Sequence, residues 1–181
     1  IGLAEVLYVP NKDNSIFRLK YRYKIGTLSD LKESLAASYI QFLGTDKMSA
    51  EQISKEFYKI ACSFNISAGE EYTTVSIEGL QDNFDKAVTL YENIINNVDP
   101  DDAALKSLIT RIEKSRKDRK LNKGAIMQGL TSYAIYGKDN NFNYTLSSKD
   151  LDATTHSELV DRLRNLNNFE QNIIYYATKP L

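Results

Sequence analysis

The sequence predicts an α+β fold, with one mixed, largely antiparallel sheet and helices packed on one face of it. Segments with strand-like alternation come in pairs and segments with helical periodicity come in runs, which favours this class over a doubly wound fold. Residues 16–24 alternate apolar and charged side chains, so one face of the sheet is expected to contact water. The 181 residues are enough for one domain with a core, and we expect a single domain over residues 1–181, a fragment of a larger multi-domain protein.

The composition excludes several classes of protein. Hydrophobic residues make up 42% and charged residues 26% of the chain, as in globular proteins. The net charge of −1 provides no long-range attraction to nucleic acid or to an anionic membrane. Because of this charge, we expect no nucleic-acid partner. No apolar run is long enough to span a bilayer and the N-terminus does not resemble a leader, so we also expect no membrane segment. The compartment stays open, and a periplasmic or secreted parent protein is compatible with the sequence.

The first half of the chain is predicted to begin with two strands, over residues 4–9 and 16–24, joined by a turn at 10–14. The strongest helical pattern follows at residues 31–45, where most of the helix surface is apolar and burial is therefore expected. Asp30 and Glu33 have the spacing of a capping box at its start. Its apolar face contains Leu31, Leu35, Tyr39 and Phe42.

A second helix is predicted from the Ser49 and Gln52 capping pair to Ile60, followed by a hairpin over residues 62–68 and 72–78. The second half is mainly helical. Its predicted elements are helices over 82–97, 99–123, 126–134 and 155–166, a polar loop over 137–146, a single turn over 147–151 and a last strand over 172–178.

Few residues have the pattern of a catalytic or metal site. His156 is the only histidine and Cys62 the only cysteine, so a metal site would need several carboxylates from elsewhere. A solvent-exposed position at the start of a helix is the simpler interpretation of His156. A site built from Glu33, Glu113 and His156 is a weaker alternative, because nothing in their spacing brings them together.

Two segments have alternative interpretations. The run at residues 111–123 is basic, and it predicts either a solvated helix face or a basic docking surface. Aromatic residues surround the loop at Gly137, and they indicate either a contact surface or packing of the loop onto the core. These aromatic residues are Tyr133, Tyr136, Phe142 and Tyr144.

Several strings, taken in order, resemble the pitrilysin/insulinase-like metallopeptidases of family M16. The string at residues 42–80 resembles the stretch after the family's metal-binding helix, and 82–95 resembles the helix after its hairpin. Residues 136–151 and 169–180 resemble a later loop and the closing strand. The resemblance extends over nearly the whole chain and implies an M16-type fold.

Active members of that family carry H-x-x-E-H on the central helix, where two histidines bind zinc and the glutamate activates water. Aligning the family's Gly-Thr on Gly44 and Thr45 places Leu35 and Tyr39 at the histidine positions and Ser38 at the glutamate position. Glu113 lies where a relic of the distal glutamate ligand would lie. The resemblance therefore implies a degenerate domain that binds no zinc and has no activity of its own.

The same resemblance implies partners. The parent protein would be a zinc metalloendopeptidase, with its zinc in a catalytic M16-type domain that pairs with this chain in cis or in trans. The chain would help to enclose and bind a peptide substrate, with Tyr133 and Tyr136 as candidate contact residues. A dimer is also compatible with this resemblance. The alternative is a stand-alone structural or protein-interaction subunit that reuses the fold.

Overall fold

The computed structural model describes residues 4–140 and 142–180, so Asn141 in the loop predicted over 137–146 lies outside the described residues. The chain forms two compact units: unit 1 comprises residues 1–100 and 157–181, and unit 2 comprises residues 101–156. The prediction of a single domain over 1–181 stays a prediction.

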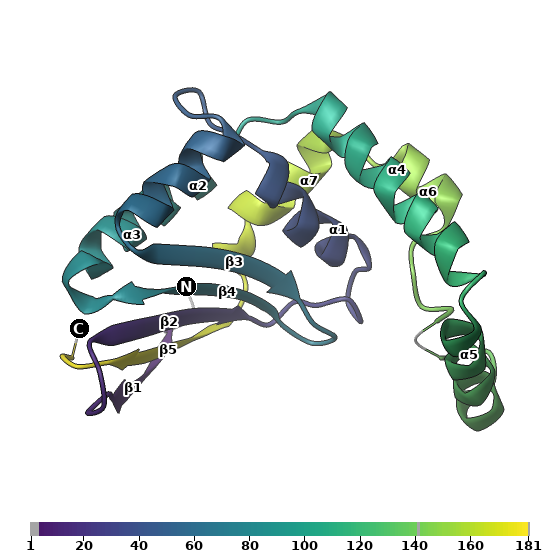
Figure 1. Cartoon of the computed structure of the whole chain (residues 1–181), viewed down its shortest axis with the longest axis horizontal. Coiled ribbons are helices and arrows are strands. Elements are labelled where there is room, and N and C mark those ends of the chain that lie inside the picture. Colours follow the sequence, from purple (N-terminus) through teal and green to yellow (C-terminus); the bar gives the residue numbers. More distant parts are fainter. Residues whose placement is uncertain (1–3, 141, 181) are drawn as a thin grey trace. The chain divides into compact units, whose positions relative to one another are not determined.

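Unit 1 contains a five-stranded mixed sheet in the order β1-β5-β2-β4-β3 (Figure 1). The β1–β5 pair is parallel and the other pairs are antiparallel, which confirms the predicted α+β class. The strands are β1 (Glu5–Pro10), β2 (Ile16–Tyr23), β3 (Cys62–Ala68), β4 (Thr73–Leu80) and β5 (Gln171–Ala177).

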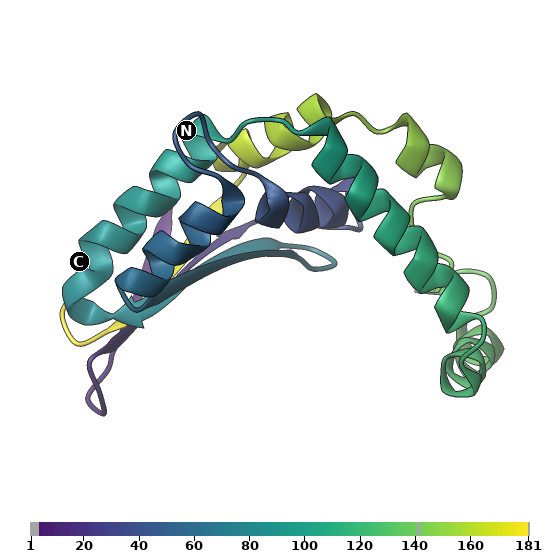
Figure 2. The ribbon, with the colours of Figure 1, turned by 45° about the horizontal axis from the view of Figure 1, so that its top comes forward.

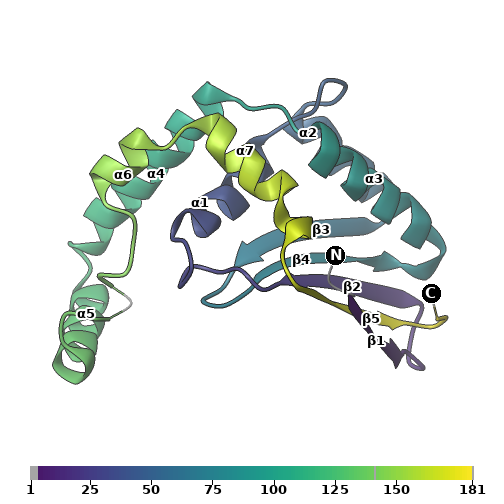
Figure 3. The same cartoon turned by 180° about the vertical axis from the view of Figure 1, so that it is seen from behind.

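Four helices cover one face of this sheet, as Figures 1 and 3 show from opposite sides. These helices are α1 (Lys32–Tyr39), α2 (Ala50–Lys59), α3 (Phe84–Asn97) and α7 (His156–Arg164). Short 3-10 turns cover Ile40–Phe42, Gln81–Asn83 and Leu166–Asn168. Among the described residues of unit 1, no helix covers the opposite face, from which Arg18 and Lys20 of β2 project.

The core of unit 1 lies between the sheet and these helices, and the central strands β2 and β4 turn alternate side chains into it. In β2, Phe17 and Leu19 are 0% and 2% exposed, and in β4 Val75 and Ile77 are both 0% exposed. Burial of such side chains is the main favourable term in folding. The alternation predicted from the sequence is confirmed in both strands.

Unit 2 contains three helices: α4 (Asp102–Arg119), α5 (Lys123–Tyr136) and α6 (Ser148–Ala153). Figure 2 shows α4 continuing through a short turn into α5. In this unit α6 packs beside α4. No helix among the described residues is both long and apolar enough to cross a membrane.

The predicted turn at residues 10–14 does not join two paired strands. β5 lies between β1 and β2 and pairs with both, so the connection spans the width of one strand. Asn11 stabilises this connection, because its side-chain amide donates to the carbonyl of Ile16 at 2.8 Å and its Oδ1 accepts from the backbone of Asp13 at 3.0 Å. The local turn signal was correct, but pairing with a strand more than 150 residues away could not be read from it.

Two predicted helix starts are also corrected. α1 begins at Lys32, with Leu31 at the N-cap, and Asp30 does bond to its first turn, since its Oδ1 accepts from the backbone N–H of Lys32 at 2.9 Å. Glu33 does not complete the capping box, because its carboxylate pairs with Arg162 instead. α4 begins at Asp102, with Asp101 rather than Asp99 as the cap, since the Asp101 carboxylate accepts from the backbone of Ala104 at 2.9 Å. The capping box of Ser49 and Gln52 at α2 is confirmed.

Candidate functional site

The central helix α1 places its two family-aligned histidine positions in the core. Leu35 is 4% exposed and Tyr39 is 0% exposed. Ser38 is half-buried, and its hydroxyl donates to the carbonyl of Ser34 one turn earlier at 2.9 Å. The apolar spacing of this segment favours this result, because a helix that is apolar over most of its surface is buried. Leu35 and Tyr39 therefore pack in the core, and Ser38 forms a hydrogen bond within the helix.

The residues at these positions do not fit a zinc ion. Zinc in proteins takes imidazole, thiolate or carboxylate ligands, and neither the leucine side chain nor the protonated phenol of a tyrosine belongs to that set. Across residues 4–140 and 142–180, no group of three or more His, Cys, Asp and Glu side chains could hold a metal ion. The sequence contains one histidine in all, so the H-x-x-E-H motif is absent from the chain.

Glu113 lies on α4, where it is held by neighbours within unit 2. Its Oε1 pairs with Arg116 at 3.2 Å and accepts from the hydroxyl of Ser148, next to the start of α6, at 2.8 Å. A carboxylate that holds α4 and α6 together has a structural role without any metal. Its assignment as a relic of a distal ligand stays a prediction.

His156 is the first residue of α7 and is half-buried. It lies near Asp102, whose pKa is lowered mainly by the hydrogen bond from Lys106 and further by the charge of His156. The alternative site of Glu33, Glu113 and His156 thus has no support, because each of the three interacts with neighbours of its own.

A cluster of ion pairs joins α1 to α7 within unit 1, and the sequence analysis missed it. Arg162 contacts the carboxylates of Asp30 at 2.7 Å, Glu33 at 3.0 Å and Glu158 at 3.2 Å. Lys32 adds a second contact to Glu158 at 2.8 Å. A glutamate inside an otherwise apolar helix was the available signal, because a buried carboxylate needs a cationic partner.

Burial sets the electrostatics of this cluster. Glu33 is only 4% exposed, and desolvation raises its pKa although Arg162 acts in the opposite direction. The pKa of Glu158 is lowered, chiefly by the hydrogen bond from Lys32. The cluster fixes two helices that are more than 100 residues apart in sequence, and its residues are all engaged with one another.

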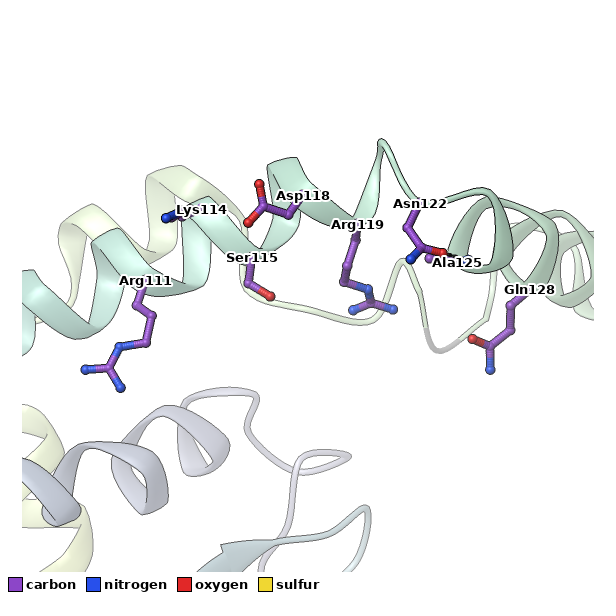
Figure 4. A pocket seen from close by; sticks show the side chains of 8 residues that line it. All are labelled: Arg111, Lys114, Ser115, Asp118, Arg119, Asn122, Ala125 and Gln128. Carbon is purple, nitrogen blue, oxygen red and sulfur yellow. Dashed lines mark hydrogen bonds between the residues drawn. The ribbon is translucent and has the colours of Figure 1, made fainter.

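An open groove of about 450 Å³ runs along one side of α4 and the beginning of α5, within unit 2. Figure 4 shows Arg111, Ser115, Arg119 and Gln128 projecting to the same side of these helices. Its eight lining residues share polar or small side chains: Arg111, Lys114, Ser115, Asp118, Arg119, Asn122, Ala125 and Gln128. The basic run predicted at residues 111–123 thus includes the wall of a groove.

The aromatic residues near Gly137 are mostly exposed. Tyr133 is 60%, Tyr136 67% and Tyr144 47% exposed, which favours the contact-surface interpretation over packing onto the core. Phe142 is the exception, since its ring lies against Gly129 of α5 and beneath the guanidinium of Arg119, which is 5.2 Å from the ring centroid. Neither Tyr133 nor Tyr136 lines the groove.

The model of the family described as "Insulinase (Peptidase family M16)" matches residues 37–149, 113 of the 181 residues. The chain belongs to this family. The matched region contains most of the strings on which the resemblance was based, including 82–95, but not the closing strand at 169–180. No match was found among curated protein sequences.

Several solved structures share the fold of this chain. A peptidase M16 inactive domain from Pseudomonas fluorescens has a TM-score of 0.78 at 16% identity, over 98% of this chain and 45% of that one. The ferredoxin protease FusC, solved in complex with Arabidopsis ferredoxin, has a TM-score of 0.77 at 13% identity, over 97% and 20%. A protease from Helicobacter pylori has a TM-score of 0.70 at 14% identity, over 96% and 44%. The chain thus spans less than half the length of each of these proteins.

Proposed function

We propose that this chain is a non-catalytic domain of an M16-type zinc metallopeptidase, which helps to enclose and bind a peptide substrate and positions a catalytic domain located elsewhere. The observation that carries this proposal is the burial of Leu35 and Tyr39 at the family-aligned metal positions of α1. The chain thus has the central helix of the fold, but Leu35 and Tyr39 on this helix are core side chains and not metal ligands.

The relatives support the same interpretation. One M16 structure with the fold of this chain is described as an inactive domain. Another is a protease that was solved with a protein bound to it. Because each is at least twice as long as this chain, a second M16-type domain in the parent protein is the natural partner, in cis or in trans. That partner would hold the zinc, and this chain would hold none.

Substrate contact is proposed for the exposed aromatic residues of α5. Tyr133 and Tyr136 present large amphipathic side chains, which contribute contact area at low cost in conformational entropy. In the parent protein they would line the surface that faces the peptide. A stand-alone interaction subunit is the second candidate, and the exposed face of α5 would serve it equally well.

Peptide cleavage by the purified chain tests the proposal. The chain is incubated with zinc and a mixture of unstructured peptides, and products are followed by mass spectrometry. The proposal predicts no cleavage above the rate with heat-denatured chain, and cleavage that a zinc chelator stops would contradict it. An H-x-x-E-H domain in the parent reading frame would favour the peptidase assignment over the interaction subunit.

A further inference from the structure

We infer that the groove of unit 2, lined by Arg111, Lys114 and Arg119, binds an acidic segment of extended peptide. The inference rests on the proposed peptide binding and names both the place and the chemical class of the segment. It is based on the charge, the shape and the polar side chains of the groove.

Charge is the first argument. Unit 2 contains ten Lys and Arg against seven Asp and Glu, a net charge of +3, whereas the whole chain has a net charge of −1. Positive charge is thus concentrated in the smaller unit. On α4 the basic residues at 111, 114 and 119 line the groove, with Asp118 as the only acidic residue in its wall. A concave basic surface raises the local concentration of acidic ligands and orients them.

Two cations of the groove, Lys114 and Arg119, form no salt bridge with an acidic residue in the part of the chain that the structure describes. Arg119 instead lies over the ring of Phe142. This contact holds the guanidinium beside the groove without using its hydrogen-bond donors. By contrast, Arg116 is not among the groove's lining residues, and it pairs with Glu113 and donates to the carbonyl of Leu146 at 2.6 Å.

Shape and the polar side chains favour a peptide. The volume of about 450 Å³ falls within the usual range of ligand pockets. Arg111 and Arg119 are eight residues apart on α4, about 12 Å of helix rise. This length corresponds to about four residues of extended chain. At the α5 end, the amide of Gln128 can both donate to and accept from a peptide main chain.

Other anionic ligands fit this surface less well. Asp118 lies among the basic residues and would repel a continuous phosphate backbone, whereas a peptide can place a neutral residue there. A lipid surface is flat and would not enter a groove. An acidic peptide with carboxylates two to four residues apart fits these features best.

The test measures fluorescence anisotropy of labelled ten-residue peptides with the purified chain at low salt. One peptide carries glutamate at alternate positions, and two matched peptides carry glutamine or lysine there. We expect the glutamate peptide to bind, the glutamine peptide to bind about tenfold more weakly, equivalent to one well-formed charge pair, and the lysine peptide not to bind. Added salt should weaken the glutamate complex.

The variant that locates the site is Lys114→Glu with Arg119→Glu. Its matched control is Lys12→Glu with Lys47→Glu, which changes the net charge equally at two exposed positions of unit 1. We expect the first pair to weaken binding of the glutamate peptide at least about tenfold, and the control to retain it within about twofold. Circular dichroism of both variants checks that the fold is kept.

Four results would overturn the inference. Equal binding of the glutamate and lysine peptides would remove the charge preference, and an effect of the control pair as large as that of the groove pair would remove the location. Preferential binding of anionic vesicles or single-stranded DNA, lost on Lys114→Glu with Arg119→Glu, would assign the groove to another ligand. If peptides bind but ignore the groove variants, the inference fails and the proposed peptide binding stands.

Discussion

Units 1 and 2 of this chain use their apolar residues in opposite ways. Unit 1 buries them between a five-stranded sheet and four helices, and its strands and helices contribute nearly all of the buried apolar side chains. Among the described residues of unit 2, only Leu105, Leu108 and Leu151 are buried apolar side chains, and α5 buries none of its residues. Unit 1 therefore has a hydrophobic core of its own, whereas most side chains of unit 2 are exposed.

The difference shows where function can be sought in this M16 domain. On α1, the most strongly patterned helix, Leu35 and Tyr39 are core side chains. The helices of unit 2 instead expose a basic groove and the tyrosines of α5. Binding residues concentrate at exposed positions because a residue that is fully packed in a core cannot contact a ligand.

Leucine truncation in the two units should give the largest contrast. We expect Leu35→Ala to lower the free energy of unfolding by about 2–5 kcal/mol, because it leaves a cavity in a packed core. Leu130→Ala on α5, where the side chain is 59% exposed, should cost within about 0.5 kcal/mol. Urea unfolding followed by circular dichroism measures both. Equal losses would show that α5 is covered, and would remove the contrast between the units.

Arg162→Met should be nearly as severe, although it replaces one side chain by another of similar length. It leaves the carboxylate of Glu33 buried without its cation, and removal of one partner from a buried ion pair costs about 3–5 kcal/mol. Because Arg162 is itself 22% exposed, we expect the lower end of this range. Arg116→Met in unit 2, where both partners are 30% exposed, is the matched control and should cost about 1 kcal/mol or less. Similar losses in the two variants would contradict the special role of the α1–α7 cluster.

The pH dependence of stability should have opposite signs at two glutamates of unit 1. Burial raises the pKa of Glu33 above its ordinary value of 4.5, so the folded state binds more protons than the unfolded state between these two values. The wild type should therefore gain stability relative to Glu33→Gln as the pH falls from 7 towards 4.5.

Glu158 behaves in the opposite way. Its pKa is lowered below 4.5 by Lys32, so its contribution is present above that value and is lost as the pH falls through the folded-state pKa. The wild type should lose its advantage over Glu158→Gln below pH 4.5. Thermal melts of the wild type and both variants over this range measure the two slopes, and slopes of the same sign would contradict the assigned environments.

Removal of a helix cap should lower the stability less than the changes above. Its effect on hydrogen exchange, however, should differ clearly between the two units. The side chain of Asn122 caps α5 by accepting from the backbone of Ala125 at 3.0 Å, and Ser49 caps α2 in unit 1. Each change to alanine should cost about 1 kcal/mol of helix stability. In hydrogen exchange, Asn122→Ala should increase exchange in α5 alone, because α5 has no buried side chain that couples it to the rest. Ser49→Ala should increase exchange across both α2 and β3, because the two pack together. Increased exchange in α2 alone would contradict the view that unit 1 unfolds cooperatively.

The fold was largely predictable because most of its signals are local. Alternation in β2 and β4, the capping box at Ser49 and the apolar stripe of α1 each specify an element from neighbouring residues. The position of β5 between β1 and β2 was not predicted, since strand pairing across the chain leaves no mark in the turn at Asn11. The start of α4 was displaced because Asp101, rather than Asp99, accepts from the backbone of Ala104. The capping box predicted at α1 did not form because the carboxylate of Glu33 pairs with Arg162.

The site was less predictable than the fold. The loss of H-x-x-E-H is visible in the sequence, and the burial of Leu35 and Tyr39 follows from their spacing. The ion cluster at Arg162 was missed because its members come from two distant helices. The groove was predicted only in part. The basic run was evident in the sequence, but nothing in it indicated that Arg111 and Arg119 line a groove together with Gln128 of the next helix.

Zinc binding by the purified chain tests the central claim most directly. Metal analysis after dialysis against zinc, together with titration calorimetry, gives the stoichiometry and affinity. Our account predicts no stoichiometric zinc, because Leu35 and Tyr39 provide no ligand and no cluster of suitable side chains exists among the described residues. One tightly bound zinc ion per chain, lost on Glu113→Gln, would contradict it and would show that the central helix has been aligned wrongly with the family motif.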